Sequence, residues 1–156
     1  MLNTGNYVIT ENEGVNFILN SKLAVCGDKG IHCDLMIIGD VTKHDEYDLI
    51  SLLGNLLDNA IEACAKCTDP TIKLEIKNYK DYLSITVINS TAEPVLKNNP
   101  ELKTTKKDKE LHGIGLSSIQ SVVDKYSGDI IRNDVLMNEK DAFKCSVLLK
   151  FPCTDQ

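Results

Sequence analysis

The sequence lacks long hydrophobic runs and an excess of positive charge. Its longest apolar runs, such as Leu35–Ile38, are far shorter than the roughly 20 residues that cross a bilayer. The 17 Lys and Arg are outnumbered by 23 Asp and Glu, and the net charge of −6 makes the chain a poor candidate for binding duplex DNA or anionic membranes, because both need a basic footprint. Residues 1–10 have no basic stretch followed by an apolar one, so no signal peptide is expected. We predict a soluble cytoplasmic domain that contacts neither nucleic acid nor membrane directly.

Disulfides and a structural zinc site are not expected either, although the chain has six cysteines. A chain of 156 residues rich in Leu, Ile and Val can bury a core without cross-links. Cys64 and Cys67 have the spacing of half a zinc site, and no second pair follows at a suitable distance. The other four are Cys26, Cys33, Cys145 and Cys153, which are not predicted partners. We interpret all six as reduced thiols.

Hydrophobic spacing predicts three helices and five strands. Apolar residues three and four apart predict helices over 14–29, 45–66 and 116–126. Alternation predicts strands over 34–38, 71–77, 82–88, 129–133 and 143–151, and the last four form two hairpins. The order predicts an α+β two-layer sandwich, in which about three helices cover one face of a mixed five-stranded sheet.

The segment 89–112 has no hydrophobic period and contains two Pro with many Asn, Lys and Thr. Within it, Lys97–Lys109 carries five Lys and two acids, a net +3 in a chain of −6. Structureless loops longer than about 12–15 residues are usually functional or mobile. We predict a basic lid that phosphate charge holds closed; a solvated surface loop is the alternative.

Two asparagines mark the polar face of the helix predicted over 45–66. Asn55, Asn59, Glu62 and Lys66 are spaced by four, three and four residues, so they form one stripe opposite the apolar one. Asn is a poor residue for a helix interior, and such local exceptions are typical of functional sites. Neutral amide oxygens suit Mg²⁺ beside phosphates. A plain exposed helix face is the alternative interpretation.

The sequence His112-Gly113-Ile114-Gly115-Leu116 runs into the helix predicted over 116–126. Glycines before a helix N-terminus let the backbone approach a ligand and leave N–H groups that bind anions. The third glycine of a dinucleotide fingerprint is missing, and the Gly-Lys-Ser/Thr of a P-loop does not follow. We predict an anion site here; a simple tight loop is the alternative.

In this order, the motifs resemble those of the GHKL ATP-binding superfamily, and within it the sensor histidine kinases. The stretch Leu52–Ala63 resembles the family's N box, and His112–Leu116 resembles its second glycine box. Together with Thr104-Thr105-Lys106 and the segment 118–129, they resemble the quorum-sensing peptide receptors of the accessory-gene-regulator type. The resemblance covers roughly residues 4–151 and implies a Bergerat-type ATP-binding fold.

The resemblance implies a role for each motif. Asn59 would coordinate the Mg²⁺ that bridges the ATP phosphates, with Asn55 helping one turn earlier, so both are implied catalytic and metal-binding residues. Lys106 in the lid over 89–112 would contact phosphate. The implied nucleotide-binding residues are Asn55, Asn59, Asn89, Lys106, His112, Gly113, Ile114, Gly115 and Leu116.

The sequence departs from the family pattern at two places. Most histidine kinases have an Asp-x-Gly-x-Gly box after the second hairpin strand, whereas this sequence reads Val87-Ile88-Asn89-Ser90-Thr91. Asn89 would therefore receive the adenine amino group without the charge of an Asp. Glu62 stands where many relatives have a non-acidic residue, and it would repel phosphate unless it faces Mg²⁺ or Lys66.

The resemblance implies an ATP-binding catalytic domain over residues 14–152, with residues 1–13 as the remnant of a linker from an upstream dimerisation helix. The domain would pass the γ-phosphoryl of Mg-ATP to a His on a separate dimerisation domain of a membrane-anchored receptor, which then signals to a response regulator. The three His, His32, His44 and His112, do not lie in such a helix. The alternatives are a Ser/Thr protein kinase of the anti-sigma type and a degenerate GHKL module that does not bind ATP.

Overall fold

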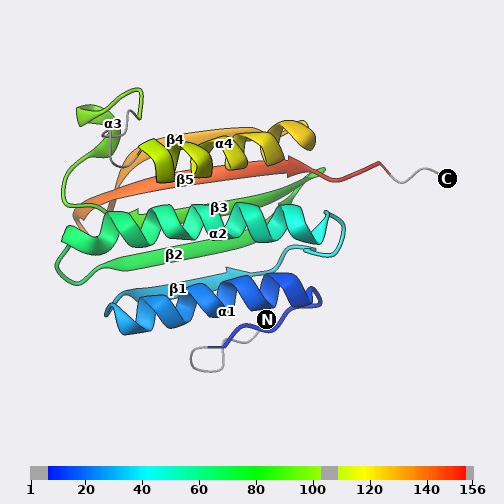
Figure 1. The fold of residues 1–156 in the computed structure, drawn as a ribbon, viewed down its shortest axis with the longest axis horizontal. Helices are drawn as coiled ribbons and strands as arrows, with labels where there is room; N and C mark the ends of the chain where they lie inside the picture. Colours follow the sequence, from blue (N-terminus) through cyan, green and yellow to red (C-terminus); the bar gives the residue numbers. More distant parts are fainter. Residues whose placement is uncertain (1–6, 103–108, 154–156) are drawn as a thin grey trace.

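The chain folds as a two-layer α+β sandwich in which helices cover one face of a five-stranded sheet (Figure 1). A computed structural model describes residues 7–102 and 109–153, with the backbone alone for residues 109–114. The mixed sheet and its one-sided helical layer confirm the predicted fold class.

The described elements follow the predicted order. The helices are α1 (Glu13–Asp28), α2 (Glu46–Ala63), α3 (Val95–Asn98) and α4 (Lys109–Lys125), and the 3₁₀ turn η1 (Cys64–Lys66) follows α2. The strands are β1 (His32–Ile37), β2 (Thr71–Tyr79), β3 (Tyr82–Ser90), β4 (Asp129–Met137) and β5 (Lys140–Lys150). The sheet order is β1-β2-β3-β5-β4, with β1 and β2 parallel and the other neighbours antiparallel.

Helix α2 lies over the middle of the sheet, between α1 and α4 (Figure 1). Its N-cap Asp45 accepts a hydrogen bond from the Asp48 amide at 3.1 Å, and acidic residues in the first turn favour the helix dipole. Its apolar stripe is buried against the sheet; the buried residues are Leu49, Leu52, Leu53, Gly54, Leu56, Leu57, Ala60 and Ile61. This packing fixes which face of α2 stays open to a ligand.

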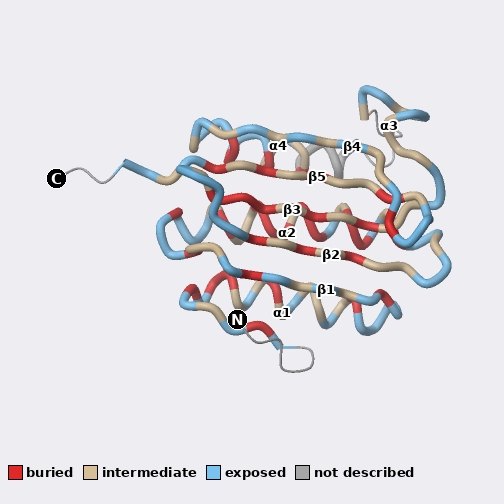
Figure 2. Tube along the Cα trace, turned by 180° about the vertical axis from the view of Figure 1, so that it is seen from behind, coloured by how far each residue is buried: buried red, intermediate tan, exposed pale blue. Residues whose placement is uncertain are grey.

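The core lies between the two layers. The inward side chains of the central strands are almost fully buried; they are Ile72, Leu74, Ile76, Leu83, Ile85, Val147 and Leu149. Figure 2 views the sheet from the side away from the helices, where exposed and half-buried residues alternate with these buried ones. The alternation is that of a sheet with one face packed and one face in water.

Helix α4 begins at Lys109, seven residues before the predicted start at Leu116. Gly113, Ile114 and Gly115 therefore lie inside the helix, and the prediction that they precede its N-terminus is wrong for this structure. The physical reason is that a helical Gly is only about 1 kcal/mol less favourable than Ala, while Lys, Glu and Leu before it are good helix formers. Amides in a helix interior bond to the carbonyl four residues back, so they form no anion site here.

The segment 89–112 is not one structureless loop, so that prediction is also wrong in part. Its first two residues complete β3, α3 forms within it, and its last four residues belong to α4. Asp134 on β4 accepts hydrogen bonds from the amides of Val95, Leu96 and Lys97 at 2.8, 3.0 and 2.9 Å. This carboxylate caps α3 and joins the start of the predicted lid to the sheet, whereas Lys106 and Thr104–Thr105 lie outside the described residues.

The predicted end of the third helix at Ser127-Gly128 is confirmed. Ser127 adopts a positive φ of 49°, and the Gly128 amide donates to the Val123 carbonyl at 2.9 Å. A Cβ on Gly128 would overlap the carbonyl oxygen of Leu148, so only glycine fits this turn. The turn directs the chain from α4 into β4.

The cysteines are free thiols, as predicted. Burial raises the pKa of the Cys64 thiol to about 11. Among the described residues, no group of three or more His, Cys, Asp or Glu side chains is arranged so that it could hold a metal ion.

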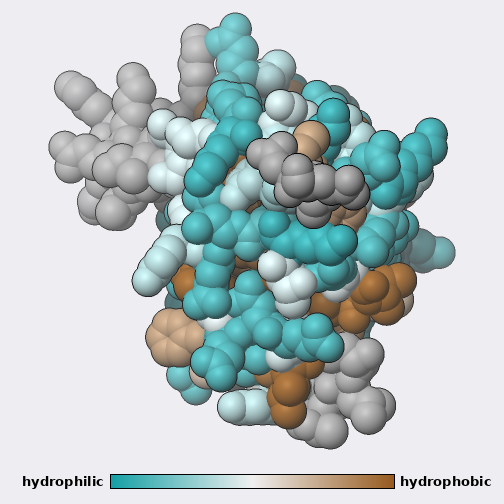
Figure 3. Space-filling view, turned by 90° about the vertical axis from the view of Figure 1, so that its right-hand side faces the viewer, coloured by the Kyte–Doolittle hydropathy of each residue, from teal (hydrophilic) through white to brown (hydrophobic). Residues whose placement is uncertain are grey.

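Within the described part of the chain, no helix has the length and apolar character to span a bilayer. Figure 3 shows one end of the molecule, where hydrophilic side chains predominate and hydrophobic ones gather in small areas.

Candidate functional site

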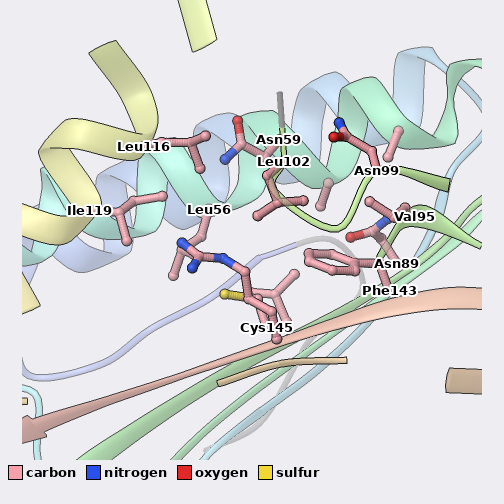
Figure 4. Close-up of a pocket in the computed structure, with 14 residues that line it drawn as sticks. Leu56, Asn59, Asn89, Val95, Asn99, Leu102, Leu116, Ile119, Phe143 and Cys145 are labelled. Atoms are coloured by element: carbon pink, nitrogen blue, oxygen red, sulfur yellow. The ribbon is translucent and has the colours of Figure 1, made fainter. Parts of the chain in front are cut away.

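A cavity of about 220 Å³ lies between α2, α4, the sheet and the segment after β3 (Figure 4). Its apolar lining comes from Leu56, Ala60, Ala63, Val87, Val95, Leu102, Leu116, Ile119, Phe143 and Cys145, and its polar lining from Asn59, Asn89, Asn99 and Arg132. Mostly apolar walls with a few convergent polar groups are typical of small-molecule sites.

The volume sets what the cavity can enclose. Sites that bury a drug-sized ligand usually measure roughly 300–1,000 Å³, and 220 Å³ is below that range. The cavity can therefore bury a flat ring system and must leave the rest of a larger ligand outside. Figure 4 shows Asn59 and Leu116 on the helical side, and Phe143 and Cys145 on the sheet side.

The asparagine pair of α2 lies beside α4. The Asn55 amide donates from Nδ2 to the Ser51 carbonyl at 2.8 Å. A Cβ built on Gly115 would lie 3.3 Å from Asn55 Oδ1, a tight contact. Glycine at position 115 therefore lets α2 and α4 approach closely. The asparagine motif and the glycine motif lie on these two facing helices, although Asn55 and Gly115 are 60 residues apart in the chain.

Asn89 is 4% exposed and lines the cavity from the end of β3. Its Nδ2 donates to the Ser90 carbonyl at 3.1 Å, which leaves the amide oxygen as the acceptor that the side chain offers. Figure 4 places Asn89 near Val95 and Phe143, at the other end of the cavity from Leu116.

The remaining predicted residues divide into three groups. Leu116 lines the cavity, one residue after the contact at Gly115. The backbone of His112, Gly113 and Ile114 is helical, and their side chains lie outside the described part of the chain. Glu62 and Lys66 are exposed and do not line the cavity.

The sequence did not predict Arg132, Phe143 and Cys145 as site residues. All three come from the β4–β5 hairpin, where Arg132 pairs with Cys145 in the sheet register. Burial raises the pKa of the Cys145 thiol, and the positive charge of the neighbouring Arg132 acts in the opposite direction. A charged residue at an inward position of a strand, alternating with Ile130, is the signal that could have identified Arg132.

Comparison with known proteins supports a family assignment. The family model for the GHKL domain matches residues 45–150, about two thirds of the chain. A search of curated proteins finds no significant match.

Solved structures share the fold at low identity. The catalytic domain of histidine kinase ThkA is 22% identical with a TM-score of 0.65, and the match covers 92% of this chain and 96% of that one. The mycobacterial sensor histidine kinase MprB is 13% identical with a TM-score of 0.67, covering 92% and 97%. Full-length ShkA in complex with AMPPNP is 12% identical with a TM-score of 0.70, covering 95% of this chain and 31% of that one.

Proposed function

Because the chain belongs to the GHKL domain family, we propose that it is the ATP-binding catalytic domain of a sensor histidine kinase. In this proposal the cavity between α2 and the sheet receives the adenine ring. The phosphates lie outside it, along the facing sides of α2 and α4. The observation that carries the assignment is the close approach of Asn55 to Gly115, each of which is followed in the chain by a residue that lines the cavity, Leu56 and Leu116.

Asn55 and Asn59 fit a Mg²⁺ ion held mainly by phosphates. Mg²⁺ takes few protein ligands in such sites, and neutral amide oxygens add no charge that would repel phosphate. The Asn55 amide is already oriented, because its Nδ2 bonds to Ser51 and its oxygen faces α4. When bound, the ion would neutralise charge on the transferring phosphoryl group.

The chain's own residues would act by positioning, which is the main contribution of proteins to phosphoryl transfer. Leu56 and Phe143 would enclose the ring and exclude water, and Asn89 would accept from its amino group. Lys106 would contact the phosphates from the lid.

The glycine motif requires a change in α4. Gly113 and Gly115 lie inside the helix, so their amides can meet a phosphate only after the first turns of α4 unwind. We propose that nucleotide binding shortens α4 toward Leu116, which would then open the helix as the sequence predicts.

The phosphoacceptor would be a His of a separate dimerisation domain. His44 is 4% exposed and its Nε2 bonds to the Lys150 carbonyl at 2.9 Å, so it is not available as an acceptor. Burial also lowers the pKa of His44 and keeps it neutral.

The motifs further favour a receptor of the accessory-gene-regulator type, anchored in the membrane, that senses a quorum peptide and signals to a response regulator. The catalytic domain would be residues 14–152, with residues 1–13 joining it to the dimerisation helix. The segment before α1 is held against that helix, because the Asn20 side chain accepts from the Val8 amide at 2.6 Å and donates to the Val8 carbonyl at 2.9 Å.

The proposal predicts that Asn59→Ala weakens Mg-ATP binding by about tenfold or more, and ATP binding without metal much less, because a ligand oxygen of the ion is lost. Calorimetric titration with and without Mg²⁺ measures both affinities. Asn133→Ala removes an exposed Asn from β4 and serves as the control. Equal losses in both conditions would show that Asn59 is not a metal contact, and no ATP binding by the unaltered chain would favour a degenerate binding module.

A further inference from the structure

Arg132 brings a positive charge to the cavity from the sheet side. It extends from the inner face of β4, its side chain is half-buried, and it pairs with Cys145 in the sheet register. Among the described residues that line the cavity, no carboxylate faces this guanidinium. A ligand in the cavity can therefore accept hydrogen bonds from the Arg132 guanidinium, which carries five N–H donors.

Asn89 supplies the complementary group. With its Nδ2 bonded to Ser90, its oxygen can accept one hydrogen bond from a ligand. The cavity thus combines an amide acceptor with a cationic fork of donors, inside walls that are otherwise mostly apolar.

This pair of groups can satisfy either type of purine. Adenine offers an amino donor and ring-nitrogen acceptors, whereas guanine offers two adjacent acceptors, O6 and N7, together with an amino donor. The Arg fork pairs with O6 and N7 through two parallel hydrogen bonds. Asn89 can accept from the amino group of either base.

We propose that Arg132 contacts the base and makes this cavity accept 6-oxopurine nucleotides, of the guanosine class, as well as adenosine nucleotides. The inference rests on the proposed function, because it takes the cavity to be a nucleotide-base site. Arg132 is thereby a specificity-determining residue rather than a catalytic one.

Calorimetric titration of the unaltered chain with Mg-ATP and Mg-GTP tests the proposal. We expect the two dissociation constants to lie within about tenfold of each other. Arg132→Gln should weaken Mg-GTP binding by about tenfold or more, because it removes both hydrogen bonds of the guanidinium to guanine, and it should weaken Mg-ATP binding less.

Two further variants sharpen the test. Lys144→Gln removes a positive charge from β5 beside the outer face of the same sheet, so it should leave both affinities unchanged. Arg132→Lys keeps the charge and loses the fork, so it should reproduce the selective loss of Mg-GTP, and it replaces Arg132→Gln if that variant does not fold.

The outcomes separate the two proposals. Binding of Mg-ATP with Mg-GTP more than about a hundredfold weaker, or equal losses of both in the Arg132 variants, would overturn the role of Arg132 and leave the ATP site standing. Binding of neither nucleotide by the unaltered chain would overturn the proposed function and this inference with it.

Discussion

Asp48 joins the N-terminal end of α2 to the C-terminal end of α4. Its Oδ2 accepts from the Tyr126 hydroxyl at 2.6 Å and from Lys125 Nζ at 2.8 Å. Desolvation raises the pKa of this carboxyl, but the two hydrogen bonds outweigh it and hold the pKa below its ordinary value. The ionised form of Asp48 therefore stabilises the fold.

We expect Asp48→Asn to lower the free energy of unfolding by about 1 kcal/mol at neutral pH, the usual contribution of a hydrogen bond network of this size. A depressed carboxyl pKa adds stability above the unfolded pKa, near 3.9, and this stability is lost as the pH falls through the folded value. The difference between the two proteins should thus shrink as the pH falls below this unfolded pKa. Urea unfolding at neutral pH and at a series of acid pH values measures the difference.

Tyr126→Phe is the matched control for Asp48→Asn. It removes the hydroxyl that donates to Asp48 and keeps the edge contact between the rings of residue 126 and His44, whose two ring centroids lie 4.7 Å apart. A difference between Asp48→Asn and the unaltered chain that stays constant from neutral to acid pH would contradict the ionic role of Asp48.

At the scale of one element, packing and the proposed phosphate contact require different conformations of the first turns of α4. As a helix it packs closely against α2 at Gly115, yet the proposed phosphate contact needs the amides of Gly113 and Gly115 outside a helix. Gly is suited to both states, because it tolerates the helix and has access to conformations that other residues avoid.

Gly113→Ala should therefore weaken Mg-ATP binding by about fivefold, since Ala favours the helical form by roughly 1 kcal/mol. Calorimetric titration measures the affinity, and thermal unfolding should show an equal or higher Tm for the variant. Amide exchange over residues 109–115 with a non-hydrolysable ATP analogue gives the independent check. An unchanged affinity together with unchanged exchange would mean that α4 does not unwind.

At the scale of the whole molecule, the chain should act on an acceptor in another molecule. The chain has three His, and one of them, His44, is not available as a phosphoacceptor because its Nε2 is bonded to the Lys150 carbonyl. Well-oriented intramolecular reactions gain about 10⁵ M or more in effective molarity, so transfer to an untethered acceptor should be slow.

Incubation with γ-labelled ATP, alone and with a fragment that carries dimerisation helices of a histidine kinase, tests this expectation. We expect label only on the added fragment, stable in base and lost in acid. Acid-stable label on this chain would instead support the Ser/Thr kinase alternative.

The sequence by itself determined most of the helix predicted over 45–66, which the structure divides into α2 and η1, together with the two hairpins and the two-layer class. These features depend on hydrophobic spacing within short segments. The asparagine and glycine motifs were also recognisable, because each is a local pattern.

Only the tertiary structure decided what faces the cavity. Arg132 and Phe143 enter the cavity because β4 and β5 lie beside β3 in the sheet, and no local pattern encodes that neighbourhood. Contacts between residues far apart in the chain decided this lining, and hydrophobic periodicity does not record such contacts. The start of α4 at Lys109 is a different case, because local helix propensity accounts for it although the apolar spacing begins only at Leu116.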